Sequence, residues 1–268
     1  MSLGNFRGSL GNTFTTDAIN IKSYPLSEND NIVVMFSKEK GLIKGVAKGV
    51  KKPKSKLGAR MQALVANKLM LNTGKSLDVI KEAQAINPFN KLRHNLDKLN
   101  YSIYLTEIIG NFCRENTEEN PEINSKIYEL FYKSLENISN AEDFTHTLLA
   151  VLKFQLKFMR EIGLGIELGH CLKCSSKIND TAYFSIQNGG VICGDCHGDS
   201  SYSIKIHHKI KDFLCEILEQ NIDTPTKYDS LVNEKVVNGC FNLLRKYIDT
   251  QTGRECKALK VLEMTKTG

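Results

Sequence analysis

Two pairs of cysteines place the strongest constraint on how this chain can fold. Cys171 and Cys174 form one Cys-x2-Cys pair, and Cys193 and Cys196 form a second pair after a gap of eighteen residues. Each spacing lets one tight turn direct two thiolates at the same metal ion, and the gap is typical of four-cysteine zinc sites. Four sulfur ligands close a tetrahedral shell and leave no position for a reactive water. The sequence therefore predicts one structural Zn²⁺ per chain.

The segment around these cysteines is expected to form a zinc ribbon over about residues 167–200, with a hairpin between the two pairs. Two disulfides, a redox Cys-x-x-Cys or coincidence would be alternative interpretations of the spacing. No basic N-terminus followed by an apolar segment is present, which favours a cytoplasmic protein with reduced thiols. His170 and His197 flank the pairs and are expected to be ordinary surface histidines, because four thiolates already complete the shell.

The net charge of +6 is concentrated in the N-terminal part of the chain. Residues 15–85 contain thirteen Lys and Arg against six Asp and Glu, whereas residues 86–268 contain twenty-two against twenty-four. An excess of positive charge that is confined to one region indicates a polyanionic partner.

That basic region has the pattern of a small β-barrel. Short apolar or alternating segments at 17–24, 31–37, 42–48, 62–71 and 77–86 are separated by turn signals rich in glycine, proline and asparagine. Five strands within about seventy residues are typical of an oligonucleotide-binding (OB) barrel. We expect this domain to span residues 15–86, after a leader at residues 1–14 that is predicted to be disordered.

Within the predicted barrel, one long stretch of sequence contains no carboxylate. Between Glu39 and Asp78 there are ten lysine and arginine residues. Such a loop is suited to phosphates, although a solvated surface loop is the simpler alternative. The expected DNA contacts are Lys44, Lys48, Lys51, Lys52, Lys54, Lys56 and Arg60.

A second stretch in this window imitates a nucleotide-binding loop. Residues 73–76 read Thr-Gly-Lys-Ser, which resembles the end of a phosphate-binding loop. That motif needs a glycine five positions before Gly74, where this chain has Leu69, so the nucleotide-loop interpretation fails.

Residues 87–268 are expected to form a helical domain. Apolar residues recur at three- to four-residue spacing over residues 92–112, 123–135, 144–162, 210–218 and 236–244. The segment 144–162 is apolar on nearly every side, as in a central buried helix. The predicted fold class is therefore α+β and multidomain: an OB barrel, then a helical domain with the zinc ribbon inserted.

The sequence contains no convincing catalytic constellation. We find no glycine-flanked serine nucleophile, no His-Glu-x-x-His pair and no carboxylate dyad that one face would bring together. The expectation is a protein that is not an enzyme.

Several stretches together resemble the RecO family of bacterial recombination mediators. They are TDAINIK at 16–22, ENDNIVVMFSKEKG at 28–41, VAKGVKKPKS at 46–55 and KFQLKFMREIGL at 153–164, followed by the cysteine pairs. The resemblance implies binding of single- and double-stranded DNA and annealing of complementary strands. It also implies partnership with RecR in placing RecA on DNA coated by single-strand-binding protein. The alternative is a zinc-stapled interaction scaffold or a transcription-type factor whose basic loop is incidental.

The resemblance also implies a site in the helical domain for the acidic tail of single-strand-binding protein. Lys153, Phe154 and Lys157 are the expected partner-binding residues, because they pair an apolar side chain with two cations. The chain departs from the family at Lys257–Lys260, where a Lys-Ser-Arg run is frequent. It also departs at Asn20, where the first strand usually has an apolar residue.

Overall fold

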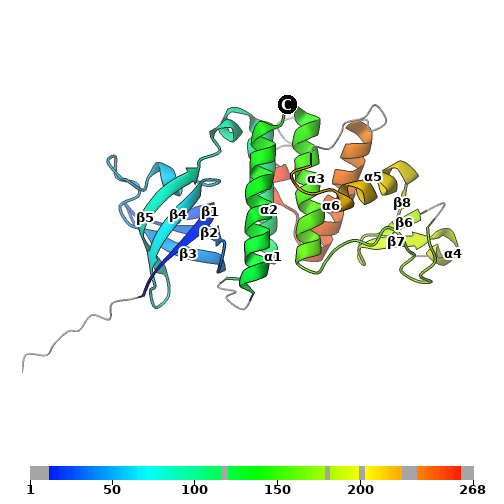
Figure 1. The fold of residues 1–268 in the computed structure, drawn as a ribbon, viewed down its shortest axis with the longest axis horizontal. Coiled ribbons are helices and arrows are strands. Elements are labelled where there is room, and N and C mark those ends of the chain that lie inside the picture. The colour runs from blue at the N-terminus through cyan, green and yellow to red at the C-terminus, as the bar shows by residue number, and fades with distance from the viewer. Residues whose placement is uncertain (1–11, 116–119, 179–181, 199–202, 225–233, 261–268) are drawn as a thin grey trace, which may run out of the picture. The chain divides into compact units, whose positions relative to one another are not determined.

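The computed structural model describes residues 12–115, 120–178, 182–198, 203–224 and 234–260. The chain divides into two compact units (Figure 1). The barrel unit contains Met1–Pro88 and Arg114–Asn124, and the helical unit contains Phe89–Cys113 and Ser125–Gly268. The barrel unit is therefore discontinuous in sequence.

Five strands close the barrel in the order β1-β2-β3-β5-β4. All neighbouring strands are antiparallel except β3 and β5, which pair in parallel through Gly45 with Asp78 and Val46 with Val79. This is the five-stranded barrel that the alternating segments predicted, with an OB-like topology. The strands are β1 (Thr13–Pro25), β2 (Asn31–Ser37), β3 (Gly41–Ala47), β4 (Ala66–Asn72) and β5 (Asp78–Asn87).

Inward-facing aliphatic side chains fill the barrel. Ala18, Val33, Met35 and Leu69 lie at its centre and are completely buried. Gly45 lies where β3 pairs with β5, and a Cβ there would stand 2.8 Å from the Ile80 side chain. A glycine at this position therefore permits the close approach of the two parallel strands.

The barrel begins earlier than the sequence suggested. β1 starts at Thr13, which pairs with Asn72, and Phe14 packs against the barrel core. The expected leader at 1–14 thus included two strand residues, because a polar segment before Phe14 hid the start of the alternation.

A segment that follows the first long helix also belongs to the barrel unit. Glu115 forms a parallel bridge with Leu42, and the Asn124 amide donates a 3.2 Å hydrogen bond to the Glu39 carbonyl. The expected domain limits of 15–86 therefore omit residues 114–124.

The helical unit is built around α3, as the all-apolar pattern predicted. Thirteen consecutive residues, from Thr147 to Met159, are buried. Asp143 caps the helix by accepting a 2.8 Å hydrogen bond from the His146 amide. α3 spans Phe144–Glu161, and the other long helices of this unit are α1 (Leu96–Phe112), α2 (Pro121–Asn140), α5 (His208–Glu219) and α6 (Glu234–Thr252). A short 3-10 helix, η2 (Asn90–His94), precedes α1 and shortens the helix expected from residue 92, because Asn95 caps α1.

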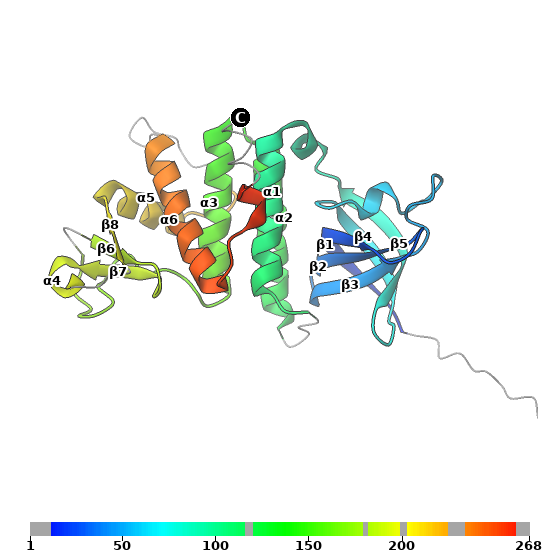
Figure 2. The ribbon, with the colours of Figure 1, turned by 180° about the vertical axis from the view of Figure 1, so that it is seen from behind.

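The ribbon is a three-stranded sheet in the order β7-β6-β8 (Figure 2). Its elements are β6 (Ala182–Ser185), β7 (Gly190–Cys193), the short helix α4 (Gly194–His197) and β8 (Ser203–Ile206). The third strand extends the ribbon past the expected limit near residue 200. Gly189, with φ +66°, fits closely against α6, since a Cβ there would stand 2.6 Å from the Tyr247 hydroxyl oxygen. Among the described residues, no helix is long and apolar enough to cross a membrane.

Candidate metal centre and nucleic-acid interface

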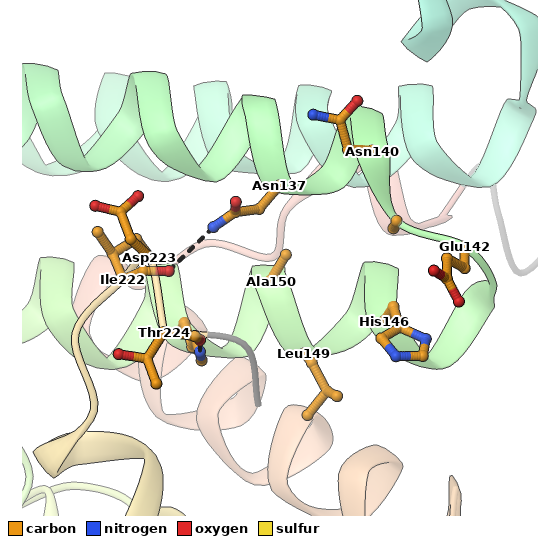
Figure 3. Close-up of a pocket in the computed structure, with 11 residues that line it drawn as sticks. Asn137, Asn140, Glu142, His146, Leu149, Ala150, Ile222, Asp223 and Thr224 are labelled. Carbon is orange, nitrogen blue, oxygen red and sulfur yellow. Dashed lines mark hydrogen bonds between the residues drawn. The ribbon is translucent and has the colours of Figure 1, made fainter. Parts of the chain in front are cut away.

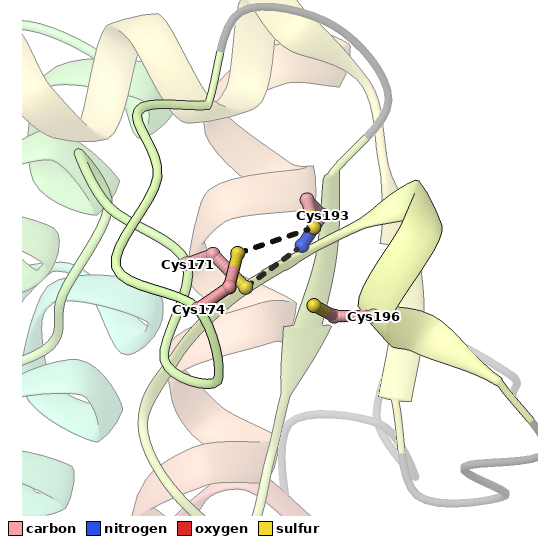
Figure 4. A group of neighbouring side chains, drawn as sticks. All are labelled: Cys171, Cys174, Cys193 and Cys196. Atoms are coloured by element: carbon pink, nitrogen blue, oxygen red, sulfur yellow. Dashed lines mark hydrogen bonds between the residues drawn. The ribbon is translucent and has the colours of Figure 1, made fainter.

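The four cysteines converge on one point, as Figure 4 shows. Cys171 and Cys174 come from the turn after the isolated bridge at His170, whereas Cys193 ends β7 and Cys196 lies in α4. Their Sγ atoms all lie within 4.8 Å of one another. A tetrahedral zinc ion with Zn–S bonds of about 2.3 Å separates its sulfur ligands by about 3.8 Å. The Sγ atoms of Cys174 and Cys193 are 3.8 Å apart, so the group fits a metal ion of this size.

The backbone of the two turns favours thiolates. The amides of Lys173 and Cys193 each donate a 3.4 Å hydrogen bond to the Cys171 Sγ. Burial opposes ionisation of Cys171, but these amides and that of Cys174 outweigh it and lower its pKa to about 6. Contacts with the thiols of Cys193 and then Cys174 raise the pKa of Cys196 to about 12. The four sulfurs therefore cannot all be ionised together unless a cation lies among them, which is the chemistry of a thiolate metal site.

The neighbouring histidines have other partners. The His197 ring stacks on Tyr183 with 3.6 Å between centroids, and its Nδ1 lies 2.9 Å from the Ser203 hydroxyl. His170 Nδ1 lies 3.8 Å from a Glu167 carboxylate oxygen. In the part of the chain that the structure describes, the candidate metal group consists of the four cysteines.

The predicted DNA-binding residues lie on or beside the long connection between β3 and β4, residues 48–65 (the basic loop). Lys44 is half-buried on β3, where its ammonium lies 2.5 Å from the Glu115 carboxylate. The other six residues of the predicted set, Lys48, Lys51, Lys52, Lys54, Lys56 and Arg60, are exposed.

The β1–β2 turn holds the first part of the basic loop. The Gly49 amide donates a 2.7 Å hydrogen bond to Asp30 Oδ1, and the Lys51 amide donates one of 3.1 Å to the Asn29 carbonyl. The Gly49 amide, followed by burial and the Ser27 hydroxyl, determines the pKa of Asp30, and the net effect is a lowering. These contacts fix the backbone of the first part of the loop, and the lysine side chains that it carries are exposed to solvent.

Two buried asparagines hold the other end of the loop. Asn20 Nδ2 donates to the carbonyl oxygens of Arg60 at 2.7 Å and Gln62 at 2.8 Å. Asn67 Nδ2 donates to the same Arg60 carbonyl at 2.8 Å. Both side chains are completely buried. In the sequence, Asn20 stands out only as a departure from the family pattern. A polar residue in an otherwise apolar strand is the signal that its side chain forms a hydrogen bond outside the strand.

The structure separates the three predicted partner-binding residues. Phe154 is completely buried and packs between Phe131 and Phe158, so its ring belongs to the core and lines no surface slot. Lys153 is only 4% exposed, and its ammonium donates to the Thr224 carbonyl. Burial, followed by the charge of Lys157, lowers the pKa of Lys153.

Two adjoining pockets flank these lysines, and both include Ile222 and Asp223. The first, of about 350 Å³, contains Lys153 together with Leu149 and Ala150, and the amide of Asn137 closes one side by a 3.1 Å hydrogen bond to the Ile222 carbonyl (Figure 3). The second, of about 460 Å³, contains Lys157. Its other cations are Lys126, Lys133 and Arg160.

Comparisons with known proteins agree with this arrangement of units. A family model described as "Recombination protein O N terminal" matches residues 12–89, and one described as "Recombination protein O C terminal" matches residues 93–260. The DNA repair protein RecO of Alkaliphilus metalliredigens is 31% identical over 87% of this chain and 91% of its own length. That of Acetivibrio thermocellus is 27% identical over 88% and 91%, and that of Clostridium acetobutylicum 26% over 94% and 98%. Matches that cover both the barrel and the helical unit show that the chain belongs to the RecO family of DNA repair proteins.

Proposed function

We propose that this protein is a non-enzymatic recombination mediator that binds single- and double-stranded DNA and anneals complementary strands. The observation that carries the proposal is the basic loop: six exposed cations stand on a backbone that Asp30, Asn20 and Asn67 fix at both ends. Because both ends of the loop are anchored, its backbone loses little freedom when the cations meet phosphates.

Annealing requires no bond-making by the protein. It requires two polyanions to approach while their bases remain free to pair. Cations that neutralise phosphates release condensed counterions and lower the repulsion between two strands. The loop offers side chains of this kind and, among its described residues, no carboxylate.

The cysteine group is proposed to hold one Zn²⁺ with a structural role. Cys171, Cys174, Cys193 and Cys196 would supply all four ligands, and a bound zinc ion would lock the two turns of the ribbon together. The reason is the separation of the sulfur atoms, which suits the bond lengths of zinc.

The two pockets beside α3 are proposed to receive the acidic tail of single-strand-binding protein. Ile222 and Leu149 offer apolar surface, and Lys157 and Arg160 offer cations for the carboxylates of the tail. Lys153 lines the first pocket beside its apolar residues and supplies a further positive charge there. Phe154 acts only through packing in the core. With RecR as a partner, the protein would then help to load RecA onto coated DNA.

An annealing assay tests the proposal. Complementary strands should anneal faster in the presence of the protein, without nucleotide, both as bare DNA and as DNA precoated with single-strand-binding protein. Simple DNA binding without annealing would instead favour a zinc-stapled interaction scaffold or a transcription-type factor.

A further inference from the structure

We propose that the barrel has a second phosphate subsite, separate from the basic loop, in the cavity between the β2–β3 turn and the β4–β5 turn. The cavity has a volume of about 250 Å³, and Lys40, Lys44 and Lys75 line it. Lys40 and Lys75 are outside the set that the sequence predicted. The ligand is the phosphodiester backbone of DNA, so the inference rests on the proposed function and extends it to a new place on the barrel.

The chemistry of the lining fits an anion. Lys75 is exposed at the tip of the β4–β5 turn, next to Ser76, which also lines the cavity. The Lys40 ammonium lies 4.4 Å above the Phe14 ring, which holds it beside the cavity. Asp78 is engaged by the turn itself, because its Oδ1 accepts a 3.1 Å hydrogen bond from the Gly74 amide. The stretch that imitates a nucleotide-binding loop thus contributes Lys75 and Ser76 to the lining of a different kind of site.

Glu115 occupies the position that a phosphate would take. Its carboxylate lies 2.5 Å from the Lys44 ammonium, and its backbone is fixed by the bridge to Leu42. The side chains of Lys44 and Glu115 are 36% and 53% exposed. Exposed ion pairs contribute little to stability, so a phosphate of the DNA backbone can replace this carboxylate at small cost. Glu115 then acts as a resident substitute for phosphate that tunes the affinity of the subsite.

The position of the subsite extends the DNA path along β3. This strand runs from the turn that carries Lys40 to Lys48 at the start of the basic loop. Its seven residues span about 23 Å, which corresponds to the rise of about seven base pairs along the axis of B-form DNA. That length lies within the range of nucleotides that one OB barrel covers.

Salt-dependent binding of a labelled single-stranded oligonucleotide to the full-length chain tests the subsite. Lys40→Ala and Lys75→Ala should each lower the slope of log K against log salt by about 0.7 and weaken binding about fivefold at 0.1 M salt. Glu115→Gln should tighten binding and steepen the slope by a similar amount, because Lys44 becomes available. Lys68→Ala, which removes an exposed lysine of β4 that is not among the cavity lining, is the matched control and should leave the slope unchanged.

The outcomes separate this inference from the proposed function. If the unmodified chain binds DNA but Lys40→Ala and Lys75→Ala behave like Lys68→Ala, or if Glu115→Gln weakens binding, the subsite is refuted and the proposed function stands. If the unmodified chain binds no DNA, the proposed function is refuted as well. Inorganic phosphate that displaces DNA more strongly than chloride at equal ionic strength, with that advantage lost in Lys75→Ala, would assign the cavity to free phosphate and overturn the inference.

Discussion

The Asn20 side-chain amide donates a 2.7 Å hydrogen bond to the carbonyl oxygen of Arg60, forty residues further along the chain. The bond joins the first barrel strand to the C-terminal part of the basic loop. It explains a polar side chain at a completely buried position, since the Asn20 amide shares the Arg60 carbonyl with Asn67 and also donates to the Gln62 carbonyl. The ordering of the cationic loop therefore depends on the barrel interior.

Asn20→Leu should loosen the loop without removing a cation. The variant removes the side-chain donor of the Gln62 carbonyl and leaves the Arg60 carbonyl with Asn67 alone, which costs about 1–3 kcal/mol of unfolding free energy. Trypsin should cleave the basic loop faster, and DNA affinity should fall while the salt slope stays constant, because every lysine remains. Asn72→Leu, at a β4 asparagine that bonds to Thr13, is the control and should leave cleavage of the loop unchanged. Equal cleavage rates in Asn20→Leu and the unmodified chain would contradict the anchoring role.

Removal of one cysteine should release the metal. Elemental analysis of protein purified in the presence of zinc should give one zinc per chain, and Cys193→Ser should lower that content because three thiolates leave the shell open. The melting temperature should also fall; the loss of stability is bounded by the roughly 10–16 kcal/mol that zinc contributes to small modules. Cys215→Ser changes a thiol outside the cluster and should retain the metal. An unchanged zinc content in Cys193→Ser would contradict the assignment of the four cysteines as zinc ligands.

Replacement of Lys51, Lys52, Lys54 and Lys56 by alanine should weaken DNA binding equally for all sequences. Each phosphate contact that is lost lowers the salt slope for single strands by about 0.7, so four contacts lower it by about 3. Fluorescence anisotropy at several salt concentrations measures the slope. A comparison variant with Lys209, Lys235 and Lys246 replaced removes exposed lysines from the helical unit. A slope that does not change in the loop variant would mean that the loop is only solvated.

Asp30 should titrate below the ordinary range of aspartate. The Gly49 amide is the largest cause of its lowered pKa, with smaller favourable contributions from Ser27 and the charges of Lys48 and Lys52. A carboxylate whose pKa is depressed by folding stabilises the folded state above the unfolded-state pKa, and this contribution is lost as pH falls through the folded-state value. The side-chain carboxyl carbon, followed by NMR, reports the titration. Asp30→Asn keeps an acceptor for Gly49 and should remove this part of the acid sensitivity; an Asp30 pKa at or above the ordinary value would contradict the account.

The lysines beside α3 should separate tail recognition from DNA annealing. Lys153→Glu would place a carboxylate at a position only 4% exposed, so we expect it to destabilise the helical unit. Lys153→Met keeps most of the packing and removes the charge. It should weaken binding of a tail peptide and annealing on coated DNA, while annealing of bare strands persists because the barrel is unchanged. Arg160→Glu, at an exposed residue of the second pocket, should have the same pattern, and loss of both kinds of annealing together would place the tail elsewhere.

Local patterns were sufficient for the strands, the long helices and the cysteine cluster, because alternation, helical spacing and Cys-x2-Cys turns each depend on near neighbours in sequence. What they missed depends on distant contacts. Phe154 became part of the core because Phe131, from another helix, covers it. Asn20 acquired its role from a loop, and Glu115 from a return of the chain to β3. β8 has only four residues and, among the described strands, pairs with β6 alone, so its signal in the sequence is weak.

The return of residues 114–124 to the barrel has a consequence for biosynthesis. During translation, all five strands have been synthesised once the ribosome passes Asn87. Two further contacts form only after α1 has been synthesised: the bridge between Leu42 and Glu115, and the hydrogen bond from the Asn124 side chain to the Glu39 carbonyl. The Asn124–Glu39 contact closes a loop of 85 residues, which makes it a late event in folding. A nascent barrel therefore leaves the exit tunnel before the ion pair between Lys44 and Glu115 can form, and this lysine gains its carboxylate partner only when Glu115 emerges.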